Sequence, residues 1–190
     1  MTTMTIKAVK TEAILYVDFL EELGRMKDAE QKLALALPLV AKAAHARNLR
    51  ELVEAHREET KGHAKSIQLI ADTLGEKLPQ KASHAMNGFL EGTVKTLVRE
   101  IASPDLDQSL IAAAQKIEHF EIAAYGTLCA WAKQLDHPHE FALLNSILNQ
   151  EKLADALLTE VAKGPTPLSE LVMQSTVRKL QRVAEAQPQS

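Results

Sequence analysis

Four long segments of this 190-residue chain carry apolar residues at the spacing of an α-helix, and acidic residues interrupt each apolar stripe near its middle. In the segment that contains Gln115–Leu128, steps of three and four residues place Glu118 and Glu121 in line with apolar residues on both sides. An ionised carboxylate that is buried without a partner is strongly destabilising. The pattern therefore predicts long helices that pack together around a shared acidic centre.

The other three stripes are interrupted at Glu30, at Glu59 and, in the last segment, at Glu151 with Asp155. The composition agrees with helices throughout, because 46% of the residues are hydrophobic, 4% are aromatic, and glycine and proline number only 7 each. We therefore expect an all-α protein, long enough for one domain with a sizeable core. A formal charge of −3 argues against nucleic acid as a partner.

The first two segments predict a helical hairpin. One helix is expected from about Thr11 to Ala46, with a kink at Pro38 because proline removes a backbone hydrogen bond. The second helix follows a short turn and ends at Leu74, where Gly75 is expected to be a left-handed cap. Helices joined by a short turn are antiparallel neighbours.

A long connection separates this hairpin from the next. After Gly75, a loop leads to a weaker helical pattern at 84–101, and long helices are predicted from about Asp105 to Asp136 and, after a short turn, to about Lys163. Two hairpins joined by a long connection form the ferritin-like arrangement, whereas an up-down-up-down bundle needs three short loops. The predicted fold is a ferritin-like four-helix bundle with a helical crossover between its second and third helices.

We expect the bundle to occupy residues 1–163 and a C-terminal extension to occupy residues 164–190. The extension carries a mildly amphipathic stripe, and three alternatives stay open: a tail helix docked on the bundle, pairing with another subunit, or fraying. The chain lacks a secretory signal pattern and a run of about 18 apolar residues, so we expect a cytoplasmic protein without a membrane partner. Cys129 is the only cysteine, which excludes an intrachain disulfide and a thiolate metal cluster.

The acidic positions match the logic of a dinuclear carboxylate metal centre. Such a centre takes one Glu from each of two helices, and a Glu with a second ligand one turn later from each of the other two. Glu30 and Glu118 fit the single positions in this chain. The pairs predicted for the other two helices are Glu59 with His63 and Glu151 with Asp155.

Two further residues enter this interpretation as alternatives. His56 is the substitute nitrogen donor if His63 points outward, and Glu121 is either a ligand or an outer, exchangeable group beside Tyr125. Oxygen-rich ligation with one imidazole favours iron or manganese, so the predicted cofactor is two ions of Fe or Mn. Six carboxylates around two divalent ions would leave net negative charge. Either one acid therefore lies outside the ligand set, or the ions are more oxidised.

The motifs AAAQKIEHFEIAAYGTL, HREETKGH and NQEKLADALLTEVA, with the stretches between them, resemble the bacterial YciE/YciF-like stress-associated ferritin-like family over residues 10–163. The resemblance implies a ferritin-like bundle with a dinuclear metal site, a homodimer and a role in stress. It implies no settled reaction, and the tail after Gly164 falls outside it.

Three functions are compatible with these features. The first is a dimetal oxidoreductase that acts on peroxide or dioxygen, in which Glu30, Glu59, Glu118 and Glu151 hold the ions. The second is a non-enzymatic protein that binds or scavenges metal under stress. The third is an interaction protein with a degenerate metal site.

Overall fold

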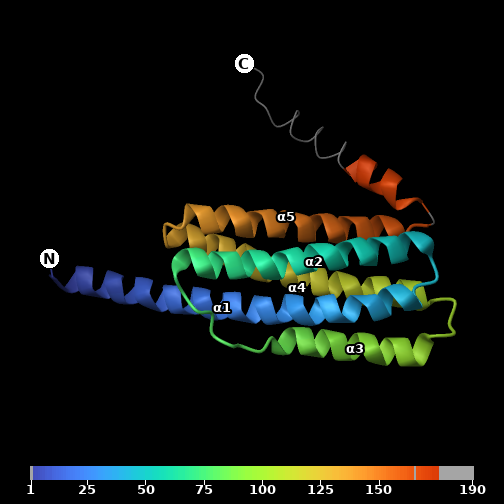
Figure 1. Cartoon of the computed structure of the whole chain (residues 1–190), viewed down its shortest axis with the longest axis horizontal. Coiled ribbons are helices and arrows are strands. Elements are labelled where there is room, and N and C mark those ends of the chain that lie inside the picture. Colours follow the sequence, from blue (N-terminus) through green and yellow to red (C-terminus); the bar gives the residue numbers. More distant parts are fainter. Residues whose placement is uncertain (1, 165, 176–190) are drawn as a thin grey trace, which may run out of the picture.

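The structure is a computed structural model that describes residues 2–164 and 166–175, with side chains from residue 12 onward. Within these residues it contains five long helices and no strand, and residues 168–175 are also helical (Figure 1). The long helices are α1 (Thr2–Ala43), α2 (Arg47–Leu74), α3 (His84–Glu100), α4 (Leu106–Gln134) and α5 (Pro138–Val161). The prediction of an all-α protein is confirmed.

The four longest helices, two before α3 in the chain and two after it, form two hairpins. Helices α1 and α2 pair in the first hairpin and α4 and α5 in the second, and the hairpins pack together through α2 against α5 and α1 against α4. Helix α3 lies outside this group of four, along α1 and α4 (Figure 1). This arrangement confirms the ferritin-like bundle with a helical crossover.

Helix α1 differs from the prediction at its start. It begins at Thr2 rather than Thr11, and the stretch before Thr11 contains no proline or glycine that would stop a helix. Pro38 lies inside α1 without ending it. A kink at Pro38 stays a prediction.

The turn between α1 and α2 is held by a residue of the second hairpin. The backbone N–H groups of His45 and Ala46 donate to the two carboxylate oxygens of Asp107, at 2.8 and 2.7 Å. Because these groups bond to α4 instead of extending α1, the helix ends at Ala43, three residues before the predicted end. The other predicted ends of long helices agree with the structure to within two residues. Gly75 forms the expected left-handed cap, with a φ of 69°.

The crossover between the hairpins is fixed against α1. A Cβ at position 24 would collide with the carbonyl oxygen of Pro79, so only Gly24 allows this close approach. The carboxylate of Asp28 accepts a hydrogen bond from the backbone N–H of Ser83 at 2.8 Å. The hydroxyl of Ser83 in turn accepts from the N–H of Met86 and caps α3. Helix α3 therefore starts at a fixed place beside α1.

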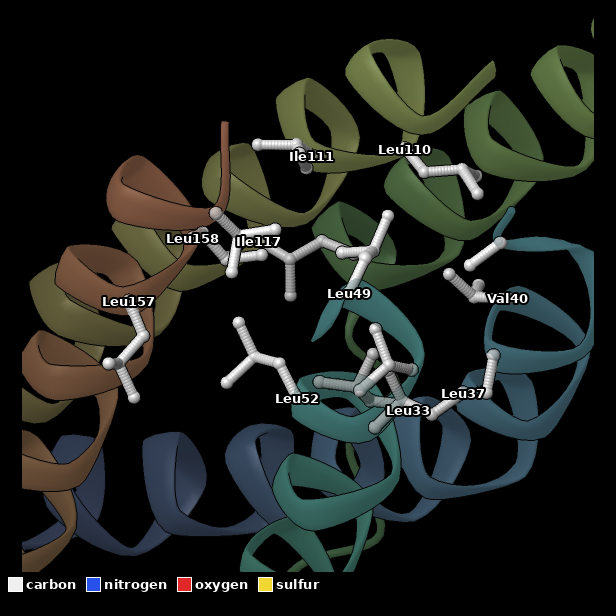
Figure 2. Packing of buried hydrophobic residues seen from close by; sticks show 14 of the residues in the cluster. Leu33, Leu37, Val40, Leu49, Leu52, Leu110, Ile111, Ile117, Leu157 and Leu158 are labelled. Atoms are coloured by element: carbon white, nitrogen blue, oxygen red, sulfur yellow. The ribbon is translucent and has the colours of Figure 1, made fainter. Parts of the chain in front are cut away.

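The interior of the bundle contains two apolar cores. One lies towards the turn between α1 and α2 and includes the residues labelled in Figure 2, such as Leu33, Leu52 and Leu158. The other lies towards the opposite end and includes Phe19 and Leu128. Charged side chains lie between the two cores, as the interrupted stripes of the sequence predict.

The first part of the C-terminal extension packs on the bundle. Leu171 is only 2% exposed and belongs to the first core, and the side-chain amide of Asn48 donates to the carbonyl oxygens of Gly164 and Thr166, both at 3.0 Å. Residues 176–190, which hold most of the predicted stripe, lie outside the described residues. The division of the chain at residue 163 stays a prediction. Within the described part, no helix is both long and apolar enough to cross a membrane.

Candidate metal centre

Six ionisable side chains from all four bundle helices converge between the two cores. Each of them is at most 5% exposed. They are Glu30 from α1, His56 and His63 from α2, Glu118 and Glu121 from α4, and Glu151 from α5. The helices place them there because their neighbours at steps of three and four residues are core residues.

The six side chains form two overlapping groups of potential metal ligands. One atom each from His56, Glu118, Glu121 and Glu151 lie within 4.8 Å of one another, and so do atoms from Glu30, His63 and Glu151. Glu151 belongs to both groups. The arrangement therefore offers two adjacent positions for cations, with the carboxylate of Glu151 shared between them.

His63 presents one ring nitrogen to the centre and uses the other to fix its orientation. Its Nε2 lies 3.0 Å from Oε1 of Gln150, which can only accept a hydrogen bond, so Nε2 carries the proton when the ring is neutral. Nδ1 lies 2.8 Å from Oε1 of Glu151 and 3.6 Å from Oε1 of Glu30. The lone pair of Nδ1 is thereby directed at the centre.

His56 also faces a carboxylate on each side, although neither of its ring nitrogens makes a hydrogen bond. Its Nε2 lies 3.3 Å from Oε1 of Glu118, and its Nδ1 lies 3.6 Å from Oε2 of Glu59. Glu59 therefore lies on the outer side of the imidazole. At 3.6 Å the contact is an ion pair and not a hydrogen bond; a closer approach of Glu59 would favour the tautomer that leaves Nε2 free for a cation.

The centre leaves many polar atoms without a hydrogen bond. Within the described residues, nine buried side-chain nitrogen and oxygen atoms have no hydrogen-bond partner, and all nine belong to the same six residues. They include both carboxylate oxygens of Glu121 and both of Glu151, of which Oε1 still lies within ion-pair distance of His63 at 2.8 Å. Buried polar atoms are normally hydrogen-bonded, and a buried cluster of nitrogen and oxygen ligands without such bonds suits bound cations. The residues present thus fit a pair of metal ions.

The centre also alters the acidity of its members. Burial raises the pKa of Glu30 and of Glu121, and it raises that of Glu118 to about 8 although His56 acts in the opposite direction. Burial alone lowers the pKa of an imidazole, but Glu118 raises that of His56 to about 9, and Glu151 with Glu30 raises that of His63 to about 10. Protons therefore supply the counter-charge that metal cations can replace.

The structure brings six of the eight predicted site residues together and leaves two outside both groups. The side chain of Glu59 is 41% exposed, because the inward face of α2 passes through Thr60 rather than Glu59. The side chain of Asp155 is 25% exposed and lies 3.2 Å from Nε2 of His119. With four carboxylates instead of six, two divalent ions would balance the acidic charge.

Two neighbours of the centre carry roles that the sequence did not indicate. Gln150 bonds to His63 from α5, and the phenol of Tyr125 donates to Oε1 of Glu30. Burial raises the pKa of Tyr125 well above its usual value, so the phenol keeps its proton. The sequence indicated that Tyr125 lies near the centre only through its place on the inward stripe of α4. No sequence signal pointed to Gln150.

Comparison with known proteins places the chain in a family. The model of a family described as "Domain of unknown function (DUF892)" matches residues 17–170, six residues beyond Gly164. Protein YciF of Escherichia coli (strain K12) is 36% identical over 145 residues, which are 76% of this chain and 87% of YciF.

Solved structures agree with this assignment. The crystal structure of the E. coli stress protein YciF has a TM-score of 0.72 at 35% identity and covers 78% of this chain and 94% of YciF. YcfI from Rhodopseudomonas palustris has the same TM-score at 33% identity, with 74% and 90% covered. A Xanthomonas campestris protein at 19% identity and a TM-score of 0.58 shares the fold. The chain therefore belongs to the DUF892 family of YciF-like proteins with a ferritin-like helical fold.

Proposed function

We propose that this chain binds two ions of iron or manganese and uses their redox chemistry on dioxygen or peroxide as part of a stress response. The observation that carries the proposal is the set of nine buried atoms without a hydrogen bond, which all belong to four carboxylates and two imidazoles. Ferritin-like dimetal proteins use the same numbers of Glu and His, although here both histidines come from α2. Similarity to the E. coli stress protein YciF supports the cellular role.

The geometry suggests a role for each residue. Glu30 and His63 would hold one ion. The other ion would be held by His56, Glu118 and Glu121. Glu151 would be shared by both ions. When bound, such a pair of ions supplies one-electron redox steps and positions for an oxygen species. The chain keeps water from the ligands by burial, and Gln150 holds the proton of His63 on Nε2.

A second function is favoured by the same burial. Ligands that are at most 5% exposed suit a protein that retains metal without turnover. This scavenging function shares the metal centre and differs in the absence of catalysis. The homodimer and the cytoplasmic location stay predictions.

Metal analysis tests the proposal. Protein loaded anaerobically with iron(II) or manganese(II) should retain two ions per chain, and Glu151→Gln should lose both because Glu151 is shared. The matched control is Glu58→Gln, an exposed residue paired with Lys61 on the same helix as the two histidines. A wild-type content near zero would refute metal binding. Two ions without peroxidase or oxidase turnover would identify the scavenging function.

A further inference from the structure

A cavity of about 40 Å³ lies in the first core, next to the candidate metal centre. His56 and Glu118 form its wall on the side of the centre, and Leu90 and Thr93 of α3 form part of its outer wall. Ala36 and Ala114 also contribute to it, and both are only partly buried. The apolar cavity therefore extends from two potential metal ligands towards the seam between α1, α3 and α4.

The lining of the apolar cavity is unsuited to water. Leu33, Leu52 and Leu158 belong to it and come from three different helices (Figure 2). Besides His56 and Glu118, the one lining residue with a polar side chain is Thr93, whose hydroxyl already donates to the carbonyl oxygen of Phe89 at 2.9 Å. A buried water needs two to four polar partners and a cavity volume of roughly 10–15 Å³. This cavity is large enough for water, but the polar groups that could bond to it are confined to His56 and Glu118 at one wall.

We propose that the apolar cavity is a binding site for dioxygen, which it holds beside His56 and Glu118. This inference rests on the proposed function and names the oxidant of that centre. Dioxygen has no hydrogen bonds to lose on burial, whereas hydrogen peroxide would bring two O–H donors and several lone pairs into a lining that is apolar except at the wall formed by His56 and Glu118. The apolar cavity therefore selects dioxygen over peroxide.

Xenon and dioxygen binding to the metal-free protein test the site without any turnover. Under pressure of either gas, methyl NMR signals of Leu110 and Ile117, which line the apolar cavity, should respond, and those of Leu128 in the other core should not. Ala114→Leu fills the apolar cavity from α4 and should abolish the response. Ala112→Leu is the matched control, because Ala112 is exposed on the same helix and does not line the apolar cavity.

The oxidation of bound iron(II) gives the second readout. Ala114→Leu should slow oxidation by dioxygen several-fold while oxidation by peroxide keeps its wild-type rate, and Ala36→Leu serves as a second filling variant from α1 if the first fails to fold. No gas response in the wild-type protein, or equal slowing for both oxidants, would overturn the proposal. A gas response in a protein that binds no metal would instead refute the proposed function and leave the apolar cavity as a gas site.

Discussion

The metal-free protein should lose stability as the pH rises from 5 to 8. Glu118 has a pKa of about 8 in the folded chain, against an ordinary value of 4.5. Between these values the folded state keeps a proton that the unfolded state has released, so the free energy of unfolding falls as pH rises. Each retained proton corresponds to about 1.4 kcal/mol per pH unit, which gives at most about 4 kcal/mol for Glu118 from pH 5 to 8.

Other groups of the centre act in the same direction. The pKa of His56 is raised to about 9, so above its ordinary value of 6.5 the folded state again holds the extra proton. Raised pKa values at Glu30 and Glu121 add to the effect. Bound metal would replace these protons, so the metal-loaded protein should be more stable and less sensitive to pH in this range.

Urea unfolding of chelator-treated protein at pH 5, 6, 7 and 8 measures the effect. Glu118→Gln should flatten the dependence and stabilise the metal-free protein at pH 8 by about 1–3 kcal/mol, less than the full proton effect because the amide is left without partners. Glu58→Gln is the control, since that side chain is 66% exposed. A free energy of unfolding that stays level or rises from pH 5 to 8 would refute the convergence of protonated acids in the core.

Three further predictions follow from the contacts. Gln150→Leu should weaken metal binding by roughly 10–100-fold, because it removes the acceptor that orients His63. Gln150→Glu keeps an acceptor at this position and should retain most of the wild-type affinity. Titration calorimetry with manganese(II) compares the two variants. Glu30→Gln should lose one of two ions, whereas Glu151→Gln should lose both, and equal losses by metal analysis would contradict the shared position of Glu151. Leu171→Ala should lower the free energy of unfolding by about 2–3 kcal/mol and leave the metal content unchanged, because this side chain belongs to the apolar core and to neither ligand group; thermal melts and metal analysis decide.

The sequence was sufficient for the fold and for the level of the centre along the bundle. Long apolar stripes with short turns and one long connection specify two hairpins, and Glu30, Glu118 and Glu151 are in phase with their stripes. Each of these acids has apolar residues on both sides at helical steps. No helix rotation compatible with the apolar core exposes them.

The sequence was insufficient where two adjacent residues compete for the inward position. On α2, steps of three or four residues connect His56 and His63 through either Glu59 or Thr60, and the rotation of the helix in the bundle selects Thr60. On α5, Ala154 is buried and Asp155 is not. Contacts between helices, such as Gln150 with His63, depend on that rotation and therefore have no local signal.

The contact of Asp107 with the turn after α1 has a consequence for the order of folding. The two N–H groups that it accepts from, at His45 and Ala46, are 62 and 61 residues away along the chain. The first hairpin therefore cannot complete its own turn until the start of α4 has arrived, and this closure carries the entropy cost of a long loop. A fragment that ends with the crossover would contain the whole first hairpin and still lack the carboxylate that closes it.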